Sequence, residues 1–479
     1  MALSRIWAAF ILISIVVAAA RYFFVPTDGE IFGSMVTGKT GDTIRYTIRV
    51  PSAASPAPSV SRAPSVSPAP SAPSVSPAPA PSPAPAGPPA PETIHAPLYR
   101  IQDANGIIET CSNAVTLSLG LIGIMALFMG LVSIAEAAGG IRLLARITGP
   151  FFTRLFPDIP KGHPAMGHMV MNFSANLLGL DNAATPFALK AMESLQEINP
   201  DKTTASNPQI MFLCLHASGL QIIPVSVMAI RASMHAPDPT DVFIPIVIAT
   251  FITTIGSMCI VAFKQKINLF QPAILVWIGS LSLIMGALVA YVRSLDVEHV
   301  QSFSRALSGG LILLIFLLIV AGAVYKKINI FDAFVQGAKG GFETAVRIIP
   351  YLVGMLVAIS MLRTSGTFGS IIHVIKQFFS AIGSDTRFVD GLPTALIKPL
   401  TSAGARGMLV DTMKTFGPDS FAARLSGILQ GSSESTFYVI AVYYGSVAIR
   451  NIRYSIGAML LADLVSILSS IFLCYLFFK

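Results

Sequence analysis

The sequence has few charged residues, and this shortage is the first guide to its class. Of its 479 residues only 12% are Asp, Glu, Lys or Arg, whereas 53% are hydrophobic. Soluble domains carry about twice that share of charge, because they need a polar shell around an apolar core. A lipid bilayer removes the need for that shell. The composition therefore argues against a soluble protein and favours a membrane protein.

Other features are missing, and each absence excludes a class of function. Cys111, Cys214, Cys259 and Cys474 are isolated, and no CxxC pair occurs, so neither a zinc site nor a disulfide framework is indicated. There is no Walker A motif, no GxGxxG loop after a strand, no HExxH and no Ser–Lys or Gly-x-Ser-x-Gly nucleophile site. No basic stretch is interleaved with aromatic residues. We therefore expect no metal or other cofactor, no enzyme activity and no nucleic-acid partner.

What the sequence does contain is a series of apolar runs that are long enough, or nearly long enough, to cross a bilayer. After a first run at the N-terminus they are residues 115–138, 210–230, 242–263, 272–292, 311–325, 346–362, 437–449 and 455–478. A span needs about 20 apolar residues, so several of these are short. The net charge is +8, and most Lys and Arg lie between the runs, as in cytoplasmic loops. The pattern predicts a multi-pass protein of the inner (plasma) membrane.

Two segments near the N-terminus differ from the rest. Residues 3–20 form an apolar run that ends in small residues, so it is either a cleaved signal peptide or a retained transmembrane helix. Residues 51–91 are a low-complexity stretch of Pro, Ala, Ser and Val. Proline lacks a backbone donor and blocks helix formation, so this stretch is predicted to be an extended spacer or a disordered loop. We assign the N-terminal helix to residues 1–38 and the inserted loop to residues 39–105.

Two polar, interrupted regions divide the membrane body, at residues 163–231 and 391–450. In each, a break rich in small and polar residues precedes an amphipathic helix, and a polar cluster then leads into an apolar run. Irregular backbone at membrane depth persists only inside protein or along a water-filled cavity. Broken segments in matching places are the usual sign of a transporter site. We therefore predict broken or re-entrant helices in both regions.

Matching residues indicate an internal duplication. Ala114 pairs with Ala345 and Ala184 with Ala405, at offsets of 231 and 221 residues, and the tripeptide Ala-Ile-Arg recurs at an offset of 219. The offsets drift by the length of a loop and keep their order. Duplicated units are common in membrane transporters. The sequence predicts an all-α polytopic membrane fold with two related halves, residues 106–300 and 301–479.

The first interrupted region carries polar residues at places where helices are expected to begin. A helix that begins at membrane depth offers free N–H groups to a polar or anionic ligand. The alternative is that these side chains only cap helices and bond neighbouring helices. A histidine in the following apolar run is either a packing residue or a proton relay, and Gly219 permits a break beside it. The candidate solute-binding residues are Asn172, Ser174, Asn176, Asp181, Asn182, Thr185, His216, Ser218 and Gln221.

The second interrupted region contains ionic groups as well as hydroxyls. Arg406 is costly at bilayer depth unless it is paired. Glu434 follows a dense cluster of hydroxyl and amide groups, and it can coordinate a cation, carry a proton or pair with Arg406. A structural Arg–Glu pair and a functional site both fit this pattern. The candidate solute-binding residues are Ser402, Arg406, Gln430, Ser432, Ser433, Glu434 and Ser435.

These regions resemble a known family. Residues 172–193, with the core Asn-Phe-Ser-Ala-Asn-Leu-Leu-Gly-Leu-Asp-Asn-Ala-Ala-Thr-Pro, resemble spore maturation protein A. The segments that resemble spore maturation protein B are residues 341–363, 399–407, 417–420 and 430–438. The chain is similar to a fusion of the two over about residues 1–38 and 106–479. Both belong to the Gate or nucleoside-recognition group, which is shared with concentrative nucleoside transporters and the membrane part of ferrous-iron transport protein B.

The resemblance implies two Gate-type halves, a retained first helix and a small polar, nucleoside-like solute. The chain departs from the family in its Pro-rich insertion and in the His-Ala-Ser-Gly sequence at residues 216–219, where the family tends to have an Asn/Thr/Ser-rich stretch. Our leading hypothesis is a transporter or permease, coupled to H⁺ or Na⁺ through Glu434. The alternative is a non-transporting membrane scaffold or sensor with a spore-maturation-like or envelope role, whose Pro-rich loop recruits a partner. Either protein can form a homo-oligomer.

Overall fold

The computed structural model describes residues 2–25, 31–37, 43–44, 47–48, 94–95, 99–100, 106–178, 181–295 and 297–478. The chain divides into two compact units, one of Met1–Gly41 with Ile101–Lys479 and one of Asp42–Arg100. In the smaller unit, short antiparallel strands pair as β1 (Thr43–Ile44) with β4 (Tyr99–Arg100) and β2 (Thr47–Ile48) with β3 (Ile94–His95). The predicted Pro-rich spacer, residues 51–91, lies outside the described residues.

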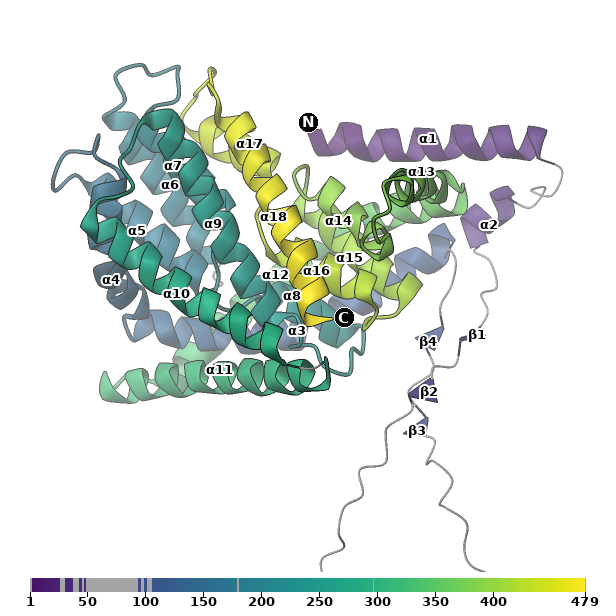
Figure 1. The fold of residues 1–479 in the computed structure, drawn as a ribbon, viewed down its shortest axis with the longest axis horizontal. Coiled ribbons are helices and arrows are strands. Elements are labelled where there is room, and N and C mark those ends of the chain that lie inside the picture. Colours follow the sequence, from purple (N-terminus) through teal and green to yellow (C-terminus); the bar gives the residue numbers. More distant parts are fainter. Residues whose placement is uncertain are drawn as a thin grey trace, which may run out of the picture. The chain divides into compact units, whose positions relative to one another are not determined.

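The larger unit consists of helices in its described residues (Figure 1). The first to appear are α1 (Ala2–Phe24) and α2 (Ile31–Thr37). The first half then comprises α3 (Ile107–Ala137), α4 (Gly140–Leu155), α5 (Pro164–Leu177), α6 (Asp181–Glu197), α7 (Asn207–Ala217), α8 (Val225–Ser233) and α9 (Phe243–Gln265). Connecting helices follow as α10 (Pro272–Ser294) and α11 (Val297–Tyr325). The second half comprises α12 (Ile330–Thr364), α13 (Thr367–Ala381), the short η2 (Arg387–Gly391), α14 (Leu392–Ile397), α15 (Ser402–Phe416), α16 (Phe421–Gly431), α17 (Thr436–Ser446) and α18 (Ser455–Phe477).

Seven of the described helices are long and apolar enough to cross a membrane: α1, α3, α9, α10, α11, α12 and α18. The predicted all-α, multi-pass membrane fold is confirmed. The first helix packs along α12, where Trp7 Nε1 donates to the Gly354 carbonyl at 2.8 Å. The expectation that this helix is retained stays a prediction, and the predicted boundary after residue 300 falls inside α11.

The predicted breaks are also present. The apolar run at residues 210–230 is not one span, because α7 ends at Ala217 and α8 begins only at Val225. Gly219 has a φ of +61°, a left-handed conformation that favours glycine, and Pro224 directly precedes α8. In the second half, α16 and α17 are separated in the same way by residues 432–435. Each half therefore contains one broken helix.

The order of elements repeats between the halves. Helices α3, α4, α6, α7, α8 and α9 recur as α12, α13, α15, α16, α17 and α18, and η2 with α14 takes the place of α5. The starts of α6 and α15 differ by 221 residues, and those of α9 and α18 by 212. The predicted two-half organisation is confirmed. The repeated tripeptide is not part of this equivalence, because Arg231 lies within α8 whereas Arg450 follows the end of α17.

Glycines allow the backbones of α3 and α12 to touch. A Cβ atom at Gly337 would lie 2.3 Å from the carbonyl oxygen of Met129, and one at Gly341 would lie 2.7 Å from that of Met125. Only glycine permits so close an approach. Residue numbers rise along α12 as they fall along α3, so the two helices are antiparallel. These equivalent helices are thus inverted relative to each other, as in transporters with inverted repeats.

The halves share one apolar core. Its largest cluster contains Val227 and Ile246 of the first half and Leu409 and Ile428 of the second, and none of these four side chains is measurably exposed. Such a contiguous cluster marks a single folding unit. The two halves therefore form one body, and residues from both are held in fixed positions where they meet.

Candidate functional site

The two broken helices meet at their breaks. The backbone N–H of Glu434 donates to the Ala217 carbonyl at 2.7 Å, and Gln221 Nε2 donates to the Gly431 carbonyl at 2.8 Å. Ser218 is buried and donates back into the last turn of α7. These bonds satisfy backbone groups that the breaks release, which is the condition for irregular backbone inside a membrane protein. Hydrogen bonds between the two breaks thus link the two halves.

The histidine of the first break belongs to a buried amide cluster. His216 Nδ1 lies 3.1 Å from Oδ1 of Asn172 and 3.0 Å from Nδ2 of Asn176. Asn172 Nδ2 also donates to the Ala184 carbonyl at 2.7 Å, and the ring of Tyr443 packs edge-on against the imidazole. Asn172 is 1% exposed and His216 is 7% exposed. Because the groups bind one another, the geometry favours the packing interpretation for these candidates.

A substitution of Asn172 by alanine tests this interpretation. We expect the variant to lose about 1–3 kcal/mol of stability, because a buried carbonyl and the imidazole lose their partner. Solute binding should be preserved in the fraction that folds. Thermal unfolding in detergent measures the loss. An Asn172→Ala protein of normal stability that no longer bound solute would instead place the amide cluster in the site.

The hydroxyl groups of the second break are also engaged with neighbours. Ser402 Oγ lies 2.7 Å from Ser435 Oγ and donates to Glu434 Oε2 at 3.4 Å. Ser432 Oγ accepts from Ser466 on α18 at 2.6 Å. Glu434 is only half-buried, so its carboxylate is the one group of this cluster that is both ionisable and accessible among these residues. Within this cluster, Glu434 is therefore the one residue that is available for ion coupling.

The remaining candidates fall into separate places. Ser433 lines a small cavity of about 10 Å³ in the second half. Ser174 Oγ and Gln430 Oε1 are buried and have no hydrogen-bond partner among the described residues. The side chains of Asp181 and Asn182 lie outside the described residues. The sequence candidates therefore do not form one constellation.

A cavity of about 680 Å³ lies between the halves. Its volume is that of a pocket for a small organic molecule. Helices α3, α6, α8, α12, α15 and α17 all contribute to its wall. Its polar lining includes Thr185, Ser226, Glu343, Tyr351, Arg406 and Tyr438. Two of the sixteen sequence candidates, Thr185 and Arg406, thus face a space that can hold a solute.

Four helix starts converge on this cavity. Thr185 and Arg406 lie in the second turns of α6 and α15, and Ser226 and Tyr438 lie in the first turns of α8 and α17. Thr185 and Arg406 differ by 221 residues, the offset between the starts of their helices, so they are equivalent positions of the repeat. The first turn of a helix carries unpaired N–H groups and a partial positive charge. Each half therefore contributes one first turn, that of α8 or α17, and one second turn, that of α6 or α15, to the shared cavity.

Arg406 is the cation of this lining. Its Nε is buried and has no hydrogen-bond partner among the described residues. The predicted pair with Glu434 is not formed, since the described contact of that carboxylate is with Ser402. The nearby Asp411 instead binds Arg363, whose Nε donates at 2.7 Å. The guanidinium is therefore held at the cavity without the partner that the sequence suggested.

Sequence reasoning missed several lining residues. Ser226 follows Pro224 by two positions, and that proline was a usable signal for a helix start at the break. Tyr438 closely follows the hydroxyl cluster. A helix start after that break was therefore a usable signal for Tyr438 as well. Glu343 and Tyr351 lie within the long helix α12; the charge of Glu343 beside an apolar run was a usable signal, whereas nothing in the local sequence separates Tyr351 from other residues of the span.

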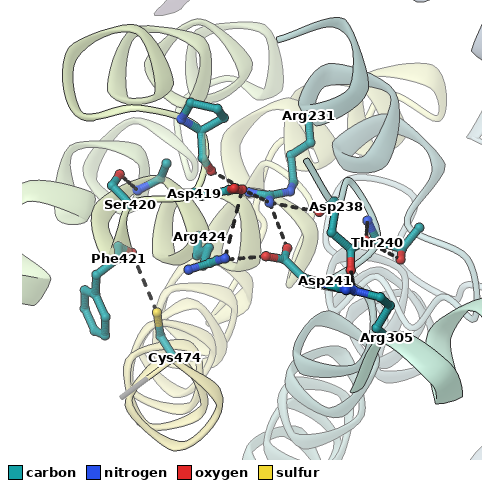
Figure 2. A network of polar contacts seen from close by, with 12 residues as sticks. Arg231, Asp238, Thr240, Asp241, Arg305, Asp419, Ser420, Phe421, Arg424 and Cys474 are labelled. Carbon is teal, nitrogen blue, oxygen red and sulfur yellow. Dashed lines mark hydrogen bonds and ion pairs between the residues drawn. The ribbon is translucent and has the colours of Figure 1, made fainter. Parts of the chain in front are cut away.

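A second polar cluster joins the halves (Figure 2), and none of its charged residues lines the cavity. Arg231 is fully buried, and its guanidinium binds Asp241 at 2.8 Å, Asp419 at 3.2 Å and the Pro418 carbonyl at 2.8 Å. Arg424 Nε completes the cluster by donating to Asp241 Oδ2 at 2.8 Å. Every charge in this cluster has an opposite neighbour, in contrast to Arg406. We interpret the Arg231 cluster as a structural tie between α8 and α16.

The fold and the shared cavity define a class, a polytopic α-helical membrane protein made of two inverted halves with broken helices. The nucleoside-recognition (Gate) family matches residues 118–234 and 345–450, one stretch in each half. The chain is 40% identical over 161 residues to spore maturation protein A of Bacillus subtilis (strain 168), which covers 33% of this chain and 82% of that protein. It is 43% identical over 165 residues to spore maturation protein B of the same organism, which covers 34% of this chain and 91% of that protein.

These two relatives match different halves of the chain. The chain therefore belongs to the spore maturation protein family and joins sequences of the A and B types in one polypeptide. The resemblance inferred from the two interrupted regions is confirmed. No solved structure matches the chain.

Proposed function

We propose that this protein is a permease that moves or gates a small polar solute across the inner (plasma) membrane. The observation that supports this most is the cavity of about 680 Å³ between the halves, where four helix starts converge. Broken helices in matching places and inverted halves are the plan of many secondary transporters, whose solute binds near the repeat interface. The family description makes a nucleoside-like solute the first to test.

The proposed permease is also assigned an ion-coupling residue, no enzyme activity and an oligomeric state. Coupling to H⁺ or Na⁺ is assigned to Glu434, the accessible carboxylate beside the crossing of the breaks. The protein has no enzyme activity in this proposal and forms a homo-oligomer if its lipid-facing helices associate. The alternative, a non-transporting scaffold or sensor, predicts that the cavity is dispensable.

Uptake into proteoliposomes tests transport directly. The panel should contain nucleosides, small organic acids and divalent cations, each measured with and without H⁺ and Na⁺ gradients. We expect flux of at least one solute, and we expect Ser226→Phe to lower it at least about tenfold because the ring would occupy part of the cavity. Ser280→Phe on the exposed face of α10 is the matched control and should transport normally.

The scaffold alternative has a distinct outcome. If folded protein moved none of these solutes, and if Ser226→Phe left the cellular role of the protein intact, the permease proposal would fail. Loss of that role on deleting the Pro-rich stretch would then support partner recruitment instead.

A further inference from the structure

We propose that the cavity between the halves receives the negatively charged group of its solute, a carboxylate or a phosphate, on the guanidinium of Arg406. The inference rests on the proposed function for transport, but it concerns binding and can be tested without flux. Guanidinium groups bind both oxyanions with the same fork of two N–H donors. The shared chemistry is therefore an oxyanion on a small molecule.

The state of Arg406 is the first support. A buried, unpaired cation costs several kcal/mol in a protein interior or a membrane, so such groups are normally paired or serve a function. Arg406 is half-buried and lines a cavity, and its Nε is buried without a hydrogen-bond partner among the described residues, as is the Nε of Arg231. Unlike Arg231, it has no carboxylate within ion-pair distance among the described residues. Arg231 and Arg424, which also lie at the contact between the halves, have carboxylate partners. An anionic ligand would give Arg406 the negatively charged partner that Asp241 gives to Arg231 and Arg424.

The helix starts are the second support. Ser226 and Tyr438 bring the first turns of α8 and α17 to the same cavity as Arg406, and Thr185 brings the second turn of α6. The partial positive charge at a helix N-terminus stabilises an anion, and more so where water is scarce. Two such ends near one guanidinium give the cavity a positive character that a neutral solute would not use.

The repeat shows that the fold does not require an arginine at this position. Thr185 occupies the equivalent position of the first half, on a helix that also begins at the cavity. The same position near the start of the helix thus carries a neutral residue in the first half and a cation in the second. Packing alone therefore does not explain Arg406.

One carboxylate faces the same cavity and has to be accounted for. Glu343 lines the α12 wall and is exposed, whereas Arg406 is half-buried with a buried Nε. Charge on an exposed group is screened by water and salt, whereas charge at a buried group is screened much less. Glu343 therefore partly offsets the positive character of the cavity on the α12 wall.

Equilibrium binding to the full chain in detergent tests the inference. The probes are succinate, inorganic phosphate, uridine monophosphate and neutral uridine, each followed by radioligand binding and by the shift in thermal unfolding. We expect at least one anion to bind and to raise the unfolding midpoint. Arg406→Gln should weaken that binding roughly 10- to 100-fold, as expected for a lost charged hydrogen bond. Arg406→Lys should weaken it less, and the exposed Arg450→Gln should bind like the wild type.

A stability readout guards against misfolding. Without any anion, Arg406→Gln should unfold at the same temperature as the wild type or higher, because it removes an unpaired cation. The order of binding among succinate, phosphate and uridine monophosphate separates a carboxylate solute from a phosphate one. Binding of uridine alone, equal in the wild type and in Arg406→Gln, would overturn the inference, and so would folded protein that bound none of the anions.

The two proposals fail in different ways. Anion binding that depends on Arg406, without flux in proteoliposomes, would leave the site in place and refute the permease. Flux of neutral uridine that is indifferent to Arg406, with no anion bound, would support the permease and refute the anion site.

Discussion

Replacing Arg231 with methionine is expected to destabilise the protein by about 3–5 kcal/mol, the usual cost of removing one partner from a buried ionic cluster. The guanidinium is fully buried, and its loss leaves Asp241 and the Pro418 carbonyl without their shared donor. Because Asp419 and Pro418 belong to the second half, the contacts of Arg231 between the halves are lost as well, and the pair of Arg424 with Asp241 remains. Denaturant or thermal unfolding in detergent, followed by the yield of monodisperse protein, measures the effect.

Arg305 offers the matched control. It pairs with Asp238 at 2.9 Å at the edge of the same cluster, but its side chain is 69% exposed. Exposed pairs contribute less than about 1 kcal/mol, so Arg305→Met should be nearly neutral. Equal losses for Arg231→Met and Arg305→Met would show that burial of the ionic cluster does not govern its contribution.

Gly337→Leu is expected to have a comparable or larger effect, about 3 kcal/mol or more. Even the first carbon of the new side chain would lie 2.3 Å from the Met129 carbonyl oxygen and 2.4 Å from the Ser133 Cβ atom. These are backbone or rigid neighbours, so α3 and α12 would have to move apart. The yield of folded protein and its unfolding temperature in detergent report the result.

Gly322→Ala on α11 is the control for this prediction. A Cβ atom there meets nothing within 4 Å, and alanine favours helix over glycine by about 1 kcal/mol. This variant should be as stable as the wild type or more so. A Gly337→Leu protein that folded with wild-type stability would mean that α3 and α12 are not in backbone contact.

Much of the fold was predictable because it follows from composition and spacing. The apolar runs gave the membrane class, and the left-handed Gly219 with Pro224 marks the break that separates α7 from α8. The repeat was visible at Ala184 and Ala405 because both alanines lie near the start of equivalent helices, where a small residue is required. The Ala-Ile-Arg match failed because apolar sequence recurs by chance, and Arg231 has a buried ionic role unrelated to the repeat.

The site was less predictable because polarity alone does not tell whether a group is free. His216 and Asn172 bind each other across 44 positions of sequence, which no local pattern reveals. The same limit applies to Arg406, for which a pair with Glu434 was a reasonable expectation. Whether a buried charge has a partner depends on side-chain directions across helices, and only the three-dimensional arrangement determines these.

The equivalence of Thr185 and Arg406 has a consequence for any bound molecule. A cavity enclosed by two inverted copies of one unit would accept a ligand in either of two opposite poses with equal ease. A hydroxyl at one of the two equivalent positions and a guanidinium at the other remove that degeneracy. A molecule with one negatively charged group would therefore bind in a single pose, with that group at the arginine of the second half.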